Sequence, residues 1–201
     1  MNITSIEALR TLYVAPQERA VKKQIAQLDE HCRRFIALSP FVLVASADQQ
    51  QNMDASPRGG VPGFIKVTAG GAVLIPDAPG NNRLDSLENI VTTARVGLLL
   101  LIPGVDETLR INGRAVLSQD AADIALCTDE RRAPKLVIKV TVEAAYLHCA
   151  KAFLRSRLWR ADAQVPRSTL PTAGKMISDQ TGIQSAPETQ DEMVKRYTPD
   201  L

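Results

Sequence analysis

Few residues in this sequence could build a metal centre or a disulfide framework. Its 201 residues include three cysteines and two histidines. Cys32, Cys127 and Cys149 stand far apart with no Cys-x-x-Cys pair, and with only His31 and His148 beside them no zinc-type ligand set can be assembled. We therefore expect no metal, and we expect the cysteines to be buried thiols in a reducing compartment.

A strong charge of either sign and a long apolar segment are also missing. Lysine and arginine outnumber aspartate and glutamate by only 24 to 22. Nucleic-acid-binding proteins concentrate cations for phosphate contacts, so we expect no nucleic acid as a partner. Charged residues interrupt the first twenty positions, and the longest apolar run, residues 96–105, is too short to cross a bilayer. These features predict a cytoplasmic protein without a membrane partner.

The composition that remains is typical of one compact domain. Hydrophobic residues make up 45% of the chain and charged residues 23%. A domain of this length buries roughly 70% of the surface that its unfolded chain exposes, so it folds without a structural metal or disulfide. Any cofactor would therefore serve function.

The N-terminal part of the sequence predicts a helix. Between residues 16 and 38 there is no glycine, and apolar residues recur every three or four positions, which is typical of an amphipathic helix. Pro40 ends it. We expect residues 1–40 to form a helical segment that packs on the domain that follows.

From residue 41 onward the pattern is that of strands. Alternating or continuous apolar runs predict six of them, at 41–45, 64–67, 72–75, 95–102, 109–117 and 136–142. The run at 95–102 is almost wholly apolar, which predicts a central strand covered on both faces. A polar hinge at 48–52 follows the first strand, and Asp120 caps a short helix at 120–127. With so few helices between the strands, we expect an antiparallel barrel or sandwich.

The end of the chain has a different character. After Trp159 it is rich in proline, threonine, serine and aspartate, with helices predicted near 172–180 and 187–196. This divides the single domain into an N-terminal segment at 1–40, a barrel at 41–160 and a peripheral tail at 161–201.

Glycine and proline give the segment 54–63 an unusual backbone path beside Arg58. Such a path can present backbone N–H groups to an anion, with the guanidinium as a further donor. The alternative is a surface loop with a solvated arginine, because loops of this composition are common and no phosphate-loop pattern is present.

The segment 76–91 leads from a strand into a helix. Asn82 and Asp85 have capping-box spacing, so the helix is predicted to begin at Asn82. Its free N–H groups and the positive end of its dipole would meet Arg83, where a mononucleotide phosphate fits. In the alternative, Asn82 and Asp85 merely cap the helix.

The segment 148–160 combines cations with the only tryptophan, Trp159. Lys151 and Arg155 are like charges four residues apart, which is unfavourable unless an anion or acid lies between them. The alternative is a solvated basic face with a core tryptophan. His148 and Cys149 resemble a nucleophile pair, but no third group orients them.

Together these segments resemble the FMN-binding split β-barrel superfamily, the pyridoxamine 5′-phosphate oxidase-like proteins, and in particular its bacterial flavoprotein branch. Five ordered pieces carry the resemblance: 54–59 with 62–64, 74–77 with 80–86, 96–99 with 102–104, 107–110 with 112–115, and 148–151 with 155–156 and 158–159. The resemblance implies a mainly β (β+α) fold, a six-stranded antiparallel split β-barrel with peripheral helices. It also implies a homodimer with FMN at the subunit interface.

The same resemblance implies which residues hold the flavin. Strand-end residues at 54–58, namely Asp54, Ala55, Ser56 and Arg58, would line it. The Asn81-Asn82-Arg83 loop takes the place of the family's Ser-Arg-Lys-like triplet, which makes Arg83 the first candidate phosphate ligand, with Ser86 and Arg58 next. The stretch with Lys151, Arg157 and Trp159 would reach over the cofactor, from either subunit.

These residues lead to an expected function. We expect an FMN-dependent oxidoreductase that moves a hydride or electrons between a reduced nicotinamide or small organic molecule and flavin, with no acid or base identified as catalytic. The Arg-x-His pattern that holds substrate in the vitamin B6 oxidases is absent after Trp159, so B6 synthesis is not expected. The alternatives are a non-catalytic flavin-binding or sensing module, the same fold with a deazaflavin, and a β-rich domain without a cofactor. Haem is disfavoured because only His148 lies near the expected groove.

Overall fold

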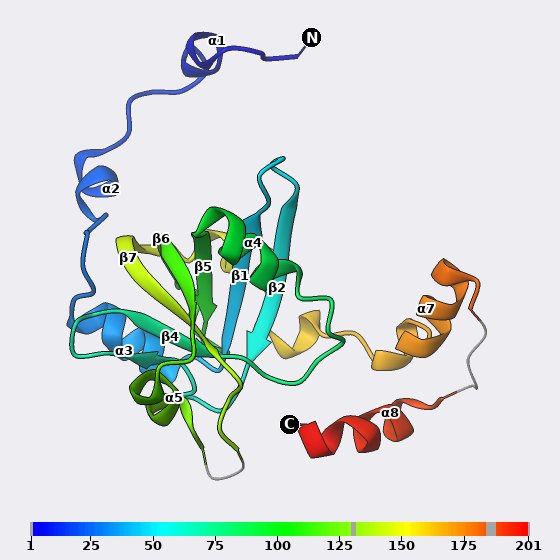
Figure 1. Cartoon of the computed structure of the whole chain (residues 1–201). Coiled ribbons are helices and arrows are strands. Elements are labelled where there is room, and N and C mark those ends of the chain that lie inside the picture. Colours follow the sequence, from blue (N-terminus) through cyan, green and yellow to red (C-terminus); the bar gives the residue numbers. More distant parts are fainter. Residues whose placement is uncertain (1, 130–131, 184–187, 201) are drawn as a thin grey trace.

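The computed structural model, which describes residues 2–129, 132–183 and 188–200, contains one curled antiparallel sheet with helices around it (Figure 1). The strand order is β2-β1-β5-β6-β7-β4-β3. The strands are β1 (Phe41–Ala47), β2 (Met53–Gly59), β3 (Lys66–Val67), β4 (Val73–Pro76), β5 (Arg95–Leu101), β6 (Thr108–Ser118) and β7 (Val137–His148). The expected β+α split barrel is confirmed, with seven strands in place of six.

The described ranges contain eight α-helices, of which α3, α4 and α5 contact the sheet. They are α1 (Ile6–Arg10), α2 (Glu18–Lys22), α3 (Glu30–Leu38), α4 (Asp85–Thr93), α5 (Ala121–Cys127), α6 (Lys151–Ser156), α7 (Ala173–Thr181) and α8 (Gln190–Tyr197). Short 3₁₀ turns lie at Ala161–Ala163, Arg167–Thr169 and Thr198–Asp200. The helix predicted near 187–196 corresponds to α8, and residue 187 lies outside the described residues.

The inner face of the curled sheet carries the core. Alternate residues of β1, β5 and β6 point inward and are fully buried, and α3 and α4 add further apolar side chains to the same cluster. The largest buried contributions include Ile36, Ile90, Leu98, Leu100 and Ile111. The same alternation of apolar residues predicted the strands from the sequence, and the residues that it marked as inward-facing form the core.

The outer face of β1 and β5 is also apolar. Leu43, Ala45, Leu99 and Leu101 alternate with the buried residues and remain half-buried. We predicted that β5 would be covered on both faces, and within one chain only its inner face is fully covered. The outer face therefore remains accessible to another molecule.

The strand missed by the sequence analysis is β2. It lies at the edge of the sheet and pairs only with β1, with Pro57 opposite Leu43. Proline has no N–H to donate and is tolerated on an edge strand, so a segment that looked like a Gly/Pro loop is a strand. The hinge at 48–52 is the tight turn that joins β1 to β2.

The single helix predicted over 16–38 is also wrong. The structure has α2 and α3, separated by a segment in which Ile25 forms an isolated bridge to Ala145 of β7. Asp29 caps α3 by accepting a 2.8 Å hydrogen bond from the Cys32 N–H. The apolar spacing continues across the break because Ile25 and Leu28 pack against the barrel core, not because they belong to one helix.

Two of the three cysteines behave as expected. Cys32 and Cys127 are buried, whereas Cys149 is exposed at the end of β7, which corrects the prediction of three buried thiols. In the described ranges, no helix is long and apolar enough to cross a membrane.

Candidate functional site

The edge strand β2 turns three of the predicted site residues to one face. Asp54, Ser56 and Arg58 are half-buried and lie opposite Ser46, Val44 and Val42 of β1, on the inner side of the sheet. Ala55 lies between them with its side chain exposed on the outer face. Any contribution of Ala55 to an inner site must therefore come from its backbone.

A hydrogen-bond network joins β2 to the start of α4. The Asp54 carboxylate accepts hydrogen bonds from the Ser56 hydroxyl, at 2.9 and 3.0 Å, and from the buried Ser86 hydroxyl at 2.5 Å. One turn further along α4, the Asn89 amide donates to the buried Ser46 hydroxyl at 3.1 Å. The structure thus brings together Asp54, Ser56 and Ser86, three of the residues that the sequence analysis named as candidates.

The helix α4 begins three residues later than predicted. Asn82 is not its cap: Leu84 is, and it provides no side-chain hydrogen bond. Both Asn82 and Leu84 have positive φ, 59° and 63°; asparagine tolerates this left-handed conformation, whereas for leucine it is strained. The Asn81 side chain accepts a 3.1 Å hydrogen bond from the Arg83 N–H. Two left-handed residues, of which Leu84 is strained, thus flank Arg83 directly before a helix N-terminus without a side-chain cap.

Arg83 also forms an ion pair with Asp85, the residue for which the sequence spacing had predicted a capping role. Its Nε donates to Asp85 at 2.8 Å, and both side chains are largely exposed. Because an exposed pair of this kind is worth about 0–1 kcal/mol, Arg83 can exchange Asp85 for a stronger anion at little cost.

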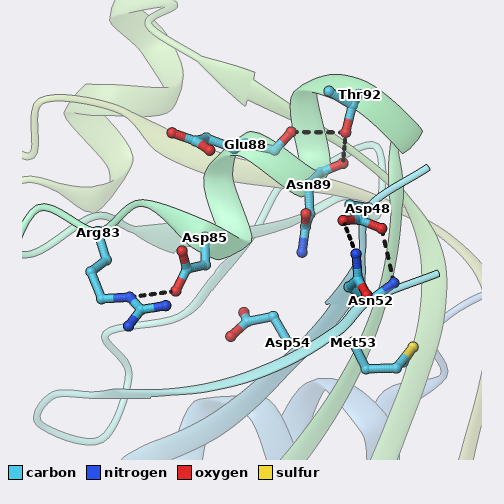
Figure 2. Close-up of a pocket in the computed structure, with 9 residues that line it drawn as sticks. All are labelled: Asp48, Asn52, Met53, Asp54, Arg83, Asp85, Glu88, Asn89 and Thr92. Atoms are coloured by element: carbon cyan, nitrogen blue, oxygen red, sulfur yellow. Dashed lines mark hydrogen bonds and ion pairs between the residues drawn. The ribbon is translucent and has the colours of Figure 1, made fainter. Parts of the chain in front are cut away.

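A pocket of about 410 Å³ opens beside this loop (Figure 2). Its lining comes from the β1–β2 turn, the start of β2, the loop before α4 and α4 itself, namely Asp48, Asn52, Met53, Asp54, Arg83, Asp85, Glu88, Asn89 and Thr92. Four of these side chains are carboxylates and one is a cation, so the inside of the pocket repels a phosphate. The residues that the sequence analysis named for a phosphate, Asn81, Asn82 and Arg83, lie in the loop before α4, and of these Arg83 lines the pocket.

The sequence analysis named the hinge at 48–52 but did not assign it to the site, where it forms the opposite wall of the pocket. Asp48 accepts hydrogen bonds from the Asn52 backbone N–H at 2.8 Å and from its side-chain amide at 2.7 Å (Figure 2). These bonds lower the pKa of Asp48. An Asp followed four residues later by Asn between two strands is a turn signal that could have located this wall.

The other predicted site residues lie elsewhere. Arg58 donates to its own neighbour, the Pro57 carbonyl, at 2.9 Å and does not line the pocket. Lys151, Arg157 and Trp159 do not line it either. One chain therefore brings the 54–58 and 81–86 segments together and leaves the third segment apart.

The third segment has an internal structure of its own. The Trp159 ring stacks on Phe153 with centroids 5.4 Å apart, and its Nε1 donates to the Val105 carbonyl at 2.9 Å. Arg157 is the C-cap residue of α6 and has a left-handed backbone with a φ of 55°. Its guanidinium forms an ion pair with the carboxylate of Asp162. Trp159 thus fixes α6 against the β5–β6 turn instead of sitting in the core.

Fold and site together define a β+α split barrel with a pocket at the hairpin β1–β2 and a helix N-terminus at its rim. Residues 28–149 match the family model described as pyridoxamine 5′-phosphate oxidase. This match covers more than half of the chain, and the protein belongs to that family.

Solved structures of similar fold have little sequence identity to this chain. A HupZ variant from Group A Streptococcus is 13% identical with a TM-score of 0.50, and the match covers 61% of this chain and 100% of HupZ. A putative pyridoxamine 5′-phosphate oxidase from Lactobacillus delbrueckii is 19% identical with a TM-score of 0.47, covering 61% and 95%. An FMN-binding protein from Syntrophomonas wolfei subsp. wolfei is 10% identical with a TM-score of 0.45, covering 58% and 83%. No curated protein matches the chain.

Proposed function

We propose that this protein binds FMN and acts as an oxidoreductase that transfers a hydride or electrons between a reduced nicotinamide, or a small organic molecule, and the flavin. The observation that carries the proposal is the loop at the pocket rim, where Asn82 and Leu84 hold positive φ on either side of Arg83 before an uncapped helix. Strain of this kind is maintained where a backbone must present its N–H groups to a ligand.

The residues present fit the phosphate end of a flavin mononucleotide. The first turn of α4 supplies backbone donors that no side-chain cap occupies, and the helix dipole favours an anion there. Arg83 adds a charge-assisted donor once it leaves Asp85. Asn81 and Asn82 are exposed on the same loop and can donate from their side-chain amides.

The pocket itself fits the uncharged part of the cofactor better than its phosphate. Asp54 and Asn89 offer acceptor and donor groups that could hold polar ring atoms, and Asp54 is already oriented by Ser56 and Ser86. Bound flavin supplies the redox chemistry, while these side chains bind and orient it. Arg58, half-buried further along β2, is the nearest additional cation on that strand.

We further propose that two copies form the functional unit. The apolar outer face of β1 and β5 is only half-buried, which suits a two-fold interface. A partner subunit would also bring the Lys151, Arg157 and Trp159 segment to a flavin, which a single chain does not do in the pocket of Figure 2.

The test begins with absorption spectra of purified protein, before and after addition of FMN and desalting, with mass spectrometry of any molecule released by heat. Flavin bands near one per chain support the proposal, and a colourless protein that retains no FMN overturns it. Retention of a deazaflavin in place of FMN identifies that alternative. Steady-state oxidation of NADH or NADPH by the loaded protein then separates an oxidoreductase from a sensing module.

The phosphate site is tested by Arg83→Ala. Because a charge-assisted hydrogen bond contributes about 1.5–3 kcal/mol, we expect the Kd for FMN to rise roughly 10- to 100-fold. The control is Arg196→Ala, which removes an exposed, ion-paired arginine from α8. Unchanged FMN affinity in the Arg83 variant would remove the assignment of the phosphate to this loop.

A further inference from the structure

The first part of the chain, residues 2–24, forms an N-terminal arm that has almost no contact with the barrel. Its helices α1 and α2 have five residues each and bury none of them. Every hydrogen bond and ion pair found for residues 2–22 stays within the arm. Figure 1 shows the arm leaving the barrel and extending well beyond it.

The arm is not polar, as a solvated extension would be. Ile6, Leu12, Tyr13 and Val14 are each more than 60% exposed, and Leu9 is 43% exposed. Ile6 and Leu9 are three residues apart in α1 and therefore share one side of that helix, and Leu12, Tyr13 and Val14 follow directly after it. Isolated helices shorter than about 12–15 residues are marginal in water, so five-residue helices with an apolar side need a surface to pack against.

The point where the arm leaves the barrel shows which surface is near. Ile25 exchanges two backbone hydrogen bonds with Ala145 of β7, at 2.8 and 3.0 Å. Lys23 donates to the Leu147 carbonyl at 2.7 Å and lies 5.2 Å from the centroid of the Tyr146 ring. The arm is thus anchored at the end of β7, beside Tyr146.

Tyr146 belongs to the outer face of the sheet. Strand register places Leu43, Leu99, Arg110 and Tyr146 in one row across β1, β5, β6 and β7. Side chains directly opposite each other in neighbouring strands point to the same face. The arm therefore leaves the barrel on the same side as the half-buried leucines, and the described residues cover neither surface fully.

The accessible surface is larger than a compact monomer needs. The chain exposes 14136 Å². A folded monomer of 21.9 kDa is expected to expose about 9,300 Å², which leaves about 4,800 Å² in excess. Obligate homodimer interfaces bury about 2,000–5,000 Å² over both subunits, so the excess on one chain is sufficient for such an interface.

We propose that the N-terminal arm of each subunit packs against a second copy of this chain that docks on the outer face of β1 and β5. The contact is reciprocal, because a two-fold axis places the second arm on the first subunit in the same way. This inference rests on the homodimer of the proposed function and adds the segment that holds it together. It predicts that Leu9 and Leu12 are covered by the partner subunit.

The direct test is photo-cross-linking of the full chain with Leu12 replaced by a benzophenone amino acid. A covalent dimer on a denaturing gel reports an inter-subunit contact, whereas a contact within one chain gives none. The matched control carries the same group in place of Leu126 of α5, which is 50% exposed against 62% for Leu12. We expect a dimer band from position 12 and none from position 126.

Light scattering and flavin absorbance of the same samples complete the test. A single-chain mass, or a two-chain mass without a dimer band from position 12, overturns the arm contact. Equal bands from both positions overturn it too. A cross-linked dimer that holds no flavin would instead contradict the proposed function alone, so the two failures are distinguishable.

A second variant removes the contact without a cross-linker. In Leu9→Asp with Leu12→Asp, two carboxylates would face the partner surface, and we expect the dimer dissociation constant to rise about tenfold or more. No residue of the arm is buried in the single chain, so the fold of the barrel is retained. The control, Glu7→Gln on the same helix, should change the constant less than about twofold. Equal dissociation constants for all three proteins would overturn the proposal.

Discussion

Ser86, buried at the start of α4, donates a 2.5 Å hydrogen bond to the carboxylate of Asp54 on β2, 32 residues earlier in the chain. The bond links the outermost strand of the sheet to the helix that covers one part of the core. Ser56 donates to the same carboxylate, so Asp54 has two partners and is held in one orientation. The wall of the pocket therefore depends on a contact between segments far apart in sequence.

Replacement of Ser86 by alanine should weaken this link. Asp54 would keep Ser56 as its only hydroxyl donor, and we expect the free energy of unfolding to fall by about 1–2 kcal/mol in urea denaturation. Thr92→Ala is the control, because the Thr92 hydroxyl bonds only to carbonyls of its own helix. Equal stability of the two variants would show that the Ser86–Asp54 bond adds nothing to the fold.

Gly113 occupies a position where no side chain fits. It lies at the register shift between β6 and β7, and a Cβ there would be 2.1 Å from the Thr141 carbonyl oxygen. Gly113→Ala must therefore move the backbone at the bulge, and we expect a loss of at least about 2 kcal/mol in the free energy of unfolding. Gly174→Ala in α7 meets no atom within 4 Å and should be neutral or slightly stabilising. A Gly113 variant as stable as the Gly174 variant would contradict this.

The strands of the core could be predicted because one physical rule determines them. Leu109, Ile111 and Ala115 alternate with polar neighbours, and burial on one face of a strand has that period. The rule does not identify β2, because its inward residues, Asp54, Ser56 and Arg58, are polar and the apolar Met53, Ala55 and Pro57 lie on the exposed face.

Tertiary contacts explain the two wrong helix boundaries. The bridge between Ile25 and Ala145 interrupts a segment with good helical spacing, and no local propensity encodes a partner 120 residues away. At α4, Asn82 and Asp85 have the spacing of a capping box, but Arg83 takes Asp85 as its ion-pair partner. The residues of the site could be predicted in part, whereas the acidic wall formed by Asp48 and Glu88 depends on how the hairpin meets the helix.

A pH dependence of stability is expected from Asp123. Hydrogen bonds from Lys139, at 2.9 and 3.1 Å, and then from Ser118 lower the pKa of this buried carboxyl. A carboxyl whose pKa is lower in the folded state stabilises the protein above its unfolded pKa, near 3.8, and loses that contribution as the pH falls through its folded value.

Asp123→Asn isolates this contribution. At neutral pH we expect it to lower the free energy of unfolding by about 1–3 kcal/mol, with the difference from the parent protein shrinking below about pH 4. Urea titrations at several pH values measure it. Asp179→Asn, which breaks an exposed pair with Lys175, is the control and should have little effect. A difference that stays constant down to pH 2 would argue against the ion pair as its source.

The three cysteines should differ sharply in reactivity. Cys149 is exposed, and a backbone hydrogen bond from Lys151 and then the charge of Lys151 lower its pKa, whereas burial raises the pKa of Cys32 and Cys127 to about 11. Because the thiolate is the reactive form, iodoacetamide at about pH 7.5 should label Cys149 alone in the folded protein and all three cysteines in urea. Peptide mass spectrometry measures the sites, and Lys151→Gln should slow the labelling of Cys149 while Lys175→Gln does not. Labelling of Cys32 at the rate of Cys149 in the native protein would mean that α3 does not stay packed on the barrel.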